Sequence, residues 1–139
     1  VLIDRLAQFY MASKLDYASN CRPPSLPDGL DAEIFSLNAL FEAWSEASDP
    51  YDREHVVPFI VRQPARFSLA NLRHAYDLSK LRWTVDEPED FAFVTEIYEL
   101  LYDANPNFQM ADVLALLKTR PELSLMNIAF FRNQRLLGV

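Results

Sequence analysis

The most informative acid in this sequence is Asp86, which ends a short run of residues that favour β structure and stands just before a proline. Trp83, Thr84 and Val85 suit a half-buried strand. Pro88 suits the first position of a helix, where its missing N–H would have had no intrahelical partner. A carboxylate at the carboxyl end of a strand points toward the crevice where open α/β sheets bind ligands. The spacing predicts Asp86 as a metal ligand, and the alternative is that Asp86 caps the helix.

A second group of acids surrounds Gly29. Asp28 and Asp31 flank Gly29 and Leu30, and Glu33 follows two residues after Asp31. Glycine permits a positive φ that other residues resist, so this turn can present both aspartates to one point. Glu33 lies on the same face as Asp31 if the segment is a regular strand. The pattern predicts a polar binding site, and the alternative is an ordinary Asp-Gly turn between strands.

A third candidate group is the triplet Arg53-Glu54-His55. Arg53 offers a guanidinium fork that can bind a phosphate or a carboxylate with two hydrogen bonds. His55 has a side chain that titrates near neutral pH, so it can act as a base or bind phosphate or sugar oxygens. The alternative is a solvated helix face.

Cys21 beside Arg22 suggests a lowered thiol pKa, but no partner spacing supports a nucleophile, and no covalent catalytic residue is predicted.

The composition excludes several classes of function. The chain has 139 residues and 50% hydrophobic content, enough for a single domain with its own core. A net charge of −7 argues against nucleic-acid binding, and no apolar run approaches the length of a membrane span. One cysteine suits a reducing, cytoplasmic location. With only two glycines, the chain contains no glycine-rich loop that could hold phosphates through backbone N–H groups.

Short strands alternate with helices along the chain, which favours an α/β layer arrangement over a helical bundle. Strands are expected at 16–19, 32–35, 67–72 and 81–85. Helices are expected at 2–13, after the N-cap Ser36, at 52–61, after Pro88, around 110–117 and from Pro121. Asp90, in the first turn after Pro88, is predicted to support the helix end rather than to bind metal. In the helix after Ser36 the predicted buried face consists of Leu37, Leu40, Phe41 and Trp44. In the helix after Pro88 it consists of Phe91, Val94, Ile97, Tyr98 and Leu101. In the last helix it includes Leu125, Ile128 and Phe131.

Four segments of the sequence resemble a known family. They are residues 83–91 (WTVDEPEDF), 16–20 (DYASN), 27–35 (PDGLDAEIF) and 53–60 (REHVVPFI). In their order along the chain they resemble the cytidylyltransferase-like proteins of polysaccharide biosynthesis, the spore-coat polysaccharide group. These are relatives of the synthetases that make CMP-activated sugar acids. The resemblance extends from the first residue to about position 127.

The resemblance implies a fold and a chemistry. The fold is the C-terminal part of a nucleotide-diphospho-sugar transferase domain, a GT-A-like and Rossmann-like mixed sheet with flanking helices. In such proteins the acid matching Asp86 coordinates a divalent ion, Mg²⁺, at the nucleotide triphosphate. The segment containing Asp28, Asp31 and Glu33 lies beside the acceptor sugar, and that containing Arg53 and His55 contributes to substrate binding. The implied reaction activates a sugar or sugar acid with CTP.

The family pattern also implies that part of the domain is absent. Relatives begin with a strand, a basic glycine-containing loop for the triphosphate and an acidic metal site. The first residues here, VLID, resemble the end of that region. The expectation is therefore one domain over 1–139 that lacks the nucleotide-binding loop and is inactive alone. Relatives commonly form homodimers through this half, so a homodimer is expected, with Phe9, Tyr17 and Val85 uncovered in the monomer. The alternative function is a non-catalytic, self-associating interaction module.

Overall fold

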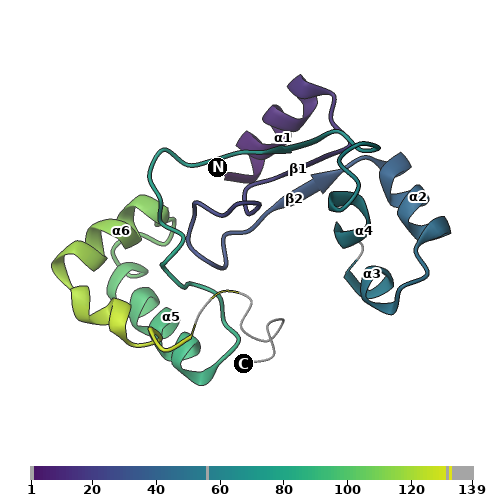
Figure 1. The fold of residues 1–139 in the computed structure, drawn as a ribbon. Coiled ribbons are helices and arrows are strands. Elements are labelled where there is room, and N and C mark those ends of the chain that lie inside the picture. The colour runs from purple at the N-terminus through teal and green to yellow at the C-terminus, as the bar shows by residue number, and fades with distance from the viewer. Residues whose placement is uncertain (1, 56, 131, 133–139) are drawn as a thin grey trace. The chain divides into compact units, whose positions relative to one another are not determined.

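A computed structural model describes residues 2–55, 57–130 and 132 of the chain (Figure 1). The chain divides into two compact units. The N-terminal unit comprises the residues up to 26 together with 31–77. The C-terminal unit comprises residues 27–30 and the chain from 78 onward. The expectation of a single domain stays a prediction. The short loop 27–30 therefore belongs to a different unit from the residues on either side of it.

The N-terminal unit is built on a small mixed sheet. Its strands are β1 (Tyr17–Ser19), β2 (Glu33–Phe35) and β3 (Leu69–Asn71), in the order β2-β1-β3. The central strand β1 pairs antiparallel with β2 and parallel with β3. All three strands lie within segments predicted as strands, and they are short. The fold is mixed α/β, as the alternation of elements predicted.

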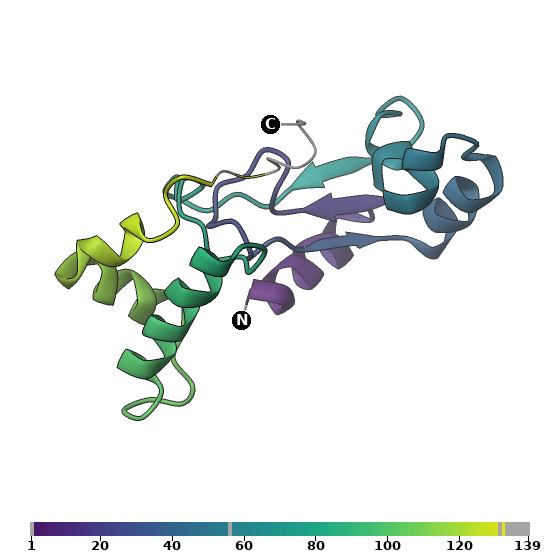
Figure 2. The ribbon, with the colours of Figure 1, turned by 90° about the horizontal axis from the view of Figure 1, so that it is seen from below.

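Helix α1 (Leu2–Ser13) confirms the first predicted helix. It contacts β1 and β2, and its residue Leu6 is buried (Figure 2). In β1, Tyr17 and Ala18 point to opposite sides of the sheet because successive strand residues alternate, and both are buried. The central strand is thus covered on both faces. Tyr17, expected to be uncovered, is 2% exposed.

Helix α2 (Leu37–Glu46) begins after Ser36, whose hydroxyl accepts a hydrogen bond from the Ala39 N–H at 3.0 Å. The predicted N-cap is confirmed. The predicted buried face is wrong, because Ala39 and Ala43 face the core. Their small side chains allow α2 to approach the neighbouring residues closely. The larger side chains on the other face are exposed, namely Leu37, Phe41 and Trp44.

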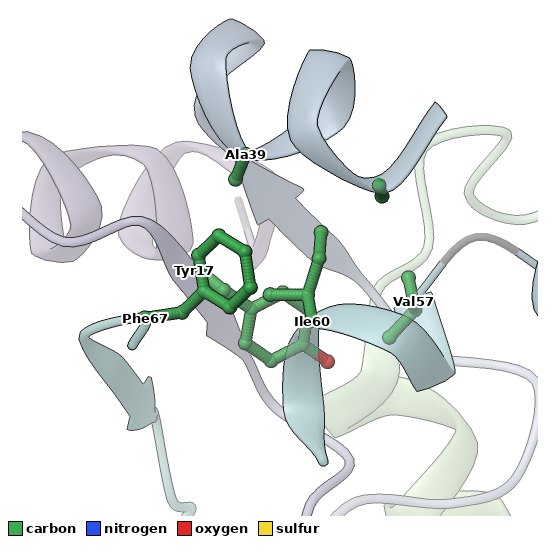
Figure 3. Close-up of a cluster of buried hydrophobic side chains, with 6 residues drawn as sticks. Tyr17, Ala39, Val57, Ile60 and Phe67 are labelled. Atoms are coloured by element: carbon green, nitrogen blue, oxygen red, sulfur yellow. The ribbon is translucent and has the colours of Figure 1, made fainter. Parts of the chain in front are cut away.

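The core of the N-terminal unit forms where α2 and the next helices meet β1. Helix α3 (Pro50–His55) and helix α4 (Val57–Val61) occupy most of the single helix expected at 52–61. Figure 3 shows the buried cluster in which Tyr17, Val57, Ile60 and Phe67 pack with the two alanines of α2. Residues from distant parts of the sequence therefore share one core.

The C-terminal unit is helical. It contains α5 (Pro88–Leu101), α6 (Met110–Thr119) and a short 3₁₀ helix, η1 (Pro121–Leu125). Its core joins Phe93 and Ile97 of α5 with residues of α6 and η1. Phe91 and Tyr98, predicted to be buried, are 66% and 51% exposed. The apolar side of α5 is thus rotated from the one that the sequence pattern suggested.

Two further expectations for this unit are corrected. The strand predicted at 81–85 is absent: Arg82 forms an isolated parallel bridge with Asp28, and Val85 is exposed. The last helix is shorter than expected, and Leu125 and Ile128 are exposed. Phe131, predicted for the same helix, lies outside the described residues. Within the described ranges, no helix is both long and apolar enough to cross a membrane.

Candidate functional site

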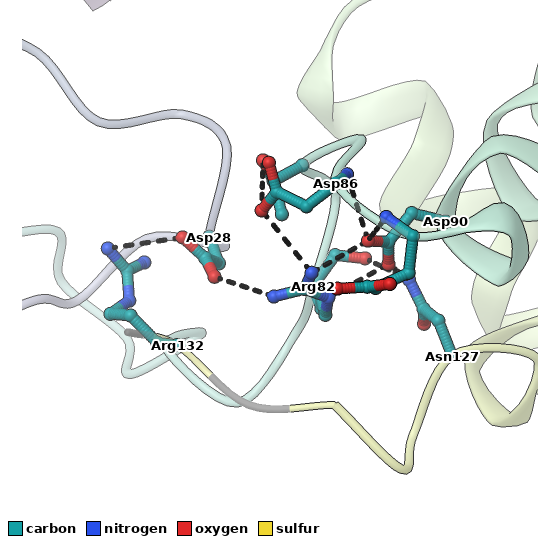
Figure 4. A network of polar contacts seen from close by, with 8 residues as sticks. Asp28, Arg82, Asp86, Asp90, Asn127 and Arg132 are labelled. Atoms are coloured by element: carbon teal, nitrogen blue, oxygen red, sulfur yellow. Dashed lines mark hydrogen bonds and ion pairs between the residues drawn. The ribbon is translucent and has the colours of Figure 1, made fainter. Parts of the chain in front are cut away.

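The guanidinium of Arg82 lies at the centre of a group of carboxylates in the C-terminal unit (Figure 4). Its Nε and Nη2 donate to the two carboxylate oxygens of Asp90 at 2.8 and 2.7 Å. Nη1 lies 3.4 Å from Asp28, and Nη2 lies 3.4 Å from Asp86. The side chain of Arg82 is only 10% exposed. One buried cation therefore contacts three acids, two of which were predicted as site residues.

Asp90 anchors this group. Its side chain is completely buried, and it accepts hydrogen bonds from the side-chain amide of Asn127 at 2.8 Å and from the N–H groups of Asp86 and Glu87. Burial raises the pKa of Asp90, but the hydrogen bonds from Arg82, Asn127 and the two N–H groups outweigh it and lower the pKa to about 2. Asp90 is thus an anion at neutral pH that supports the start of α5, as predicted.

Asp86 is placed differently from Asp90. The N-cap residue of α5 is Glu87. Asp86 therefore does not cap this helix, which was the alternative interpretation. The Asp86 side chain is 53% exposed, and its Oδ2 accepts from the Thr84 hydroxyl at 3.3 Å as well as approaching Arg82. The exposed carboxylate is accessible to a ligand, whereas Asp90 is not.

Asp28 reaches the same arginine because its loop is held against residues 81–84. The Asp28 N–H donates to the Leu81 carbonyl at 2.9 Å, and the Trp83 N–H donates to the Asp28 carbonyl at 2.7 Å. Gly29 has a φ of +100°, and a Cβ there would lie 2.5 Å from the Thr84 nitrogen. A residue other than glycine would collide with this backbone. The loop containing Asp28 therefore packs directly against the backbone of residues 81–84.

A second arginine also approaches Asp28. Nη1 of Arg132 lies 3.6 Å from Asp28 Oδ1, and both side chains are largely buried. Asp28 is thus located between two guanidinium groups, with Arg82 on its other oxygen. The two guanidinium groups hold the Asp28 carboxylate in one orientation (Figure 4).

The two other acids of the same sequence segment belong to the N-terminal unit. Glu33, at the start of β2, accepts hydrogen bonds from the Tyr17 hydroxyl and from Arg22 Nε, the latter at 3.0 Å. The Cys21 sulfur lies 3.8 Å from the same carboxylate oxygen. Burial, together with the negative charges of Glu33 and Asp31, raises the thiol pKa of Cys21 to about 11. The lowered thiol pKa suggested by the neighbouring Arg22 is wrong.

Arg53 and His55 lie on α3 of the N-terminal unit. Arg53 Nη1 donates to the carbonyls of Trp44 and Ala47 at 3.0 and 3.2 Å, which closes the C-terminal end of α2. His55 is exposed, and its ring contacts Tyr51 edge to face at 4.5 Å between centroids. Arg53 therefore has a structural partner in the described chain. The substrate-binding role of both residues stays a prediction.

The described residues offer a divalent ion a limited set of ligands. No group of three or more His, Cys, Asp or Glu side chains within them is arranged to hold a metal. Asp86 provides one exposed carboxylate beside a hydroxyl. Mg²⁺ is commonly held by one or two carboxylates with phosphate oxygens and water, so a single carboxylate fits as part of such a site.

The sequence reasoning missed Arg82, which organises the C-terminal site, and Arg22, which organises the polar group around Glu33. A signal for Arg82 was present in its spacing, because it precedes Asp86 by four residues and Asp90 by eight in an acidic segment. For Arg22 no local signal existed, since Tyr17 and Glu33 reach it through the pairing of β1 with β2.

Comparison with known proteins adds a fold relationship. No protein-family model matches the chain. The uncharacterized protein MJ1063 of Methanocaldococcus jannaschii is 28% identical over 131 residues, which cover 91% of this chain and 51% of that protein. The solved structure of a cytidylyltransferase from Leptospira borgpetersenii serovar Hardjo-bovis is similar, with a TM-score of 0.81 and 25% identity over 88% of this chain and 51% of that chain.

The chain thus spans about half the length of the curated relative and of the solved structure that it matches. Its mixed sheet with flanking helices is similar to the corresponding part of that cytidylyltransferase. In fold, this chain is cytidylyltransferase-like.

Proposed function

We propose that this chain is the part of a cytidylyltransferase-like enzyme that binds the acceptor and contributes one metal-binding acid. In the reaction an oxygen of a sugar or sugar acid attacks the α-phosphate of CTP, so that CMP is transferred and pyrophosphate leaves. The product serves polysaccharide biosynthesis, and the protein works in the cytoplasm. The observation that carries this proposal is the fold similarity to a cytidylyltransferase over 88% of the chain. The exposed carboxylate of Asp86, held beside Asp28 by one arginine, is consistent with it.

In this proposal the residues act by position and charge. Asp86 would hold Mg²⁺, which when bound neutralises charge on the triphosphate. Arg82, anchored to buried Asp90, keeps Asp86 and Asp28 oriented. Asp28, Asp31 and Glu33 accept hydrogen bonds from acceptor hydroxyls, and Arg53 and His55 contribute to substrate binding. No covalent intermediate with the protein is required, because positioning and electrostatic stabilisation suffice for nucleotidyl transfer.

The test compares variants in the protein as its gene encodes it, incubated with CTP, Mg²⁺ and candidate sugar acids or sugar phosphates. Pyrophosphate release is followed. Asp86→Asn should lower turnover at least about 100-fold, the size of effect expected from losing one electrostatic group at a reacting centre. Its melting temperature should change little, because an exposed ion pair contributes less than about 1 kcal/mol.

Glu89→Gln is the matched control, since Glu89 is an exposed acid in the first turn of α5, close to Asp86 in the sequence. It should leave turnover unchanged.

The 139-residue chain by itself should release no pyrophosphate, because it contains no glycine-rich loop for the triphosphate. Normal turnover in Asp86→Asn, combined with a large loss of stability, would show that this acid is structural.

A second candidate function is a non-catalytic module that associates with itself. It is favoured by the exposed apolar face of α2, formed by Leu37, Phe41 and Trp44. Both functions are compatible with a homodimer. They are distinguished by nucleotide transfer, which only the first predicts.

A further inference from the structure

The carboxyl ends of β1 and β3 lie side by side, because these two strands are parallel with Ser19 opposite Asn71. Ligands of open α/β sheets bind at this edge. The Asn71 side chain accepts from the Ser19 hydroxyl and from the Arg22 N–H, both at 3.0 Å, and donates to the Pro23 carbonyl at 3.0 Å. The chain leaving β1 is thus held across the edge, and Arg22 is located there.

The direction of the Arg22 side chain is set by two neighbours. Its Nε donates to Glu33 at 3.0 Å and to the Tyr17 hydroxyl at 3.1 Å. Tyr17 is 2% exposed, and its own hydroxyl donates to Glu33. Burial raises the pKa of Tyr17, so the phenol keeps its proton and remains a donor. The guanidinium is therefore oriented by a buried aromatic residue and a carboxylate that is itself hydrogen-bonded.

The outer part of this guanidinium is presented to solvent. Among the described residues, every hydrogen bond of the Arg22 side chain passes through Nε, and 48% of the side chain is exposed. The two Nη groups form the fork that binds a carboxylate with two parallel hydrogen bonds. A guanidinium whose orientation is already set loses little entropy when it binds such a group.

The acids next to Arg22 restrict what it can bind. Glu33 contacts it directly, and Asp31 is close enough to Cys21, the residue before Arg22, to help raise the thiol pKa. Two carboxylates oppose an approaching phosphate with its higher negative charge, whereas they accept hydrogen bonds from hydroxyl groups. The combination suits a ligand with one carboxylate and several hydroxyls.

We propose that Arg22 binds the carboxylate of a sugar acid at the carboxyl edge of β1 and β3. This inference rests on the proposed function, because it identifies the acceptor as an acidic sugar and Arg22 as the residue that selects it. A neutral sugar has no carboxylate to form the two charge-assisted hydrogen bonds with the guanidinium.

The test is an NMR titration of the chain, following the backbone amide signals of β1 and β3 in every variant and the Nε–Hε signal of Arg22 where the arginine is present. The probes are N-acetylneuraminate, its methyl ester and inorganic phosphate. We expect the free acid to shift the Arg22 signal, and the ester to bind at least about tenfold more weakly, as for a lost hydrogen bond to a charged group. Arg22→Gln should weaken binding of the acid to the same extent. Arg22→Lys should fall between, since it keeps the charge but loses the fork.

Arg5→Gln is the matched control, because Arg5 is an exposed arginine on α1 of the same unit, and it should bind the acid normally. The inference would be overturned if the acid and the ester bind equally, or if Arg22→Gln binds the acid as wild type does. It would also be overturned if phosphate binds more tightly than the acid, or if no probe binds. The titration contains no nucleotide. Acid binding without nucleotide transfer would thus refute the proposed function alone, and transfer without Arg22-dependent acid binding would refute this inference alone.

Discussion

At the scale of single residues, the contacts of Arg82 differ in length, and this separates one close partner from two more distant ones. Its bonds to buried Asp90 are 2.7–2.8 Å, whereas its contacts with Asp28 and Asp86 are 3.4 Å. Short charge-assisted bonds are the stronger ones. Asp90 therefore fixes the arginine, and the contacts with Asp28 and Asp86 are the weaker ones.

The low pKa of Asp90 leads to a prediction about acid stability. A carboxyl with a pKa near 2 in the folded chain and about 3.9 in the unfolded chain stabilises the fold above about pH 4. This contribution, about 2 to 3 kcal/mol, is lost as the pH falls from 4 toward 2. In urea denaturation at pH 4.5, 3 and 2, Asp90→Asn should therefore show a smaller pH dependence of the unfolding free energy than wild type.

Asp86→Asn serves as the control, because it removes an exposed acid and leaves Asp90 in place. Its pH dependence should match that of wild type. At pH 7 Asp90→Asn should also be less stable by about 3 kcal/mol, since it leaves the buried Arg82 without its main partner. An acid transition in Asp90→Asn that parallels wild type would contradict the assignment.

At the scale of elements, the loop 27–30 is joined to residues 81–84 through backbone hydrogen bonds and the close approach of Gly29. This contact places Asp28 beside an arginine that lies more than fifty residues later in the sequence. The loop is consequently part of the architecture of the C-terminal unit rather than an ordinary surface turn.

Gly29→Ala should destabilise the C-terminal unit by at least about 2 kcal/mol, because it combines a positive φ with overlap of the new Cβ and the Thr84 backbone. Gly29→Asn should be as harmful, although asparagine tolerates positive φ better than alanine, since it carries the same Cβ. Glu89→Ala, at an exposed position of α5, should change stability by no more than about 0.5 kcal/mol. Thermal unfolding by circular dichroism measures all three. Rescue of stability by asparagine would mean that φ, and not overlap, sets the requirement for glycine.

At the scale of the whole molecule, the outer face of α2 is apolar and exposed. Leu37, Phe41 and Trp44 recur at helical spacing and are 64%, 57% and 67% exposed. Burying each 100 Å² of such apolar surface contributes roughly 2.5 kcal/mol before the cost of association. Exposed apolar faces of this kind commonly mark interfaces.

We therefore expect the chain to be a dimer at micromolar concentration, as measured by light scattering. Trp44→Lys should shift it toward the monomer, because the charge must be desolvated on association. Ile3→Lys is the matched control, since Ile3 is 69% exposed on α1 away from this face, and it should leave the dimer intact. A monomer mass for wild type, or equal effects of the two lysine substitutions, would exclude α2 as the interface.

The sequence by itself determined most of the elements, because their signals are local. Ser36 provides an N-cap, Pro88 starts a helix, and the prolines around 23–27 interrupt the strand pairing. Asp90 as the acid that supports the start of α5 also followed from its position in the first turn. These features depend on a residue and neighbours within one helical turn.

Only the tertiary structure decided which faces are buried and which side chains meet. The core uses Ala39 and Ala43 rather than the large residues of α2, because Tyr17 and Ile60 fill the space facing that helix. Residues 81–85 do not form a strand, because they pair with one loop residue instead of a neighbouring strand. Arg22 acquires its role from Glu33 on a different strand, and Arg82 meets Asp28 from more than fifty residues away, so only the fold could assign these two contacts. The spacing of Arg82 to Asp86 and Asp90, in contrast, is a local signal in the sequence.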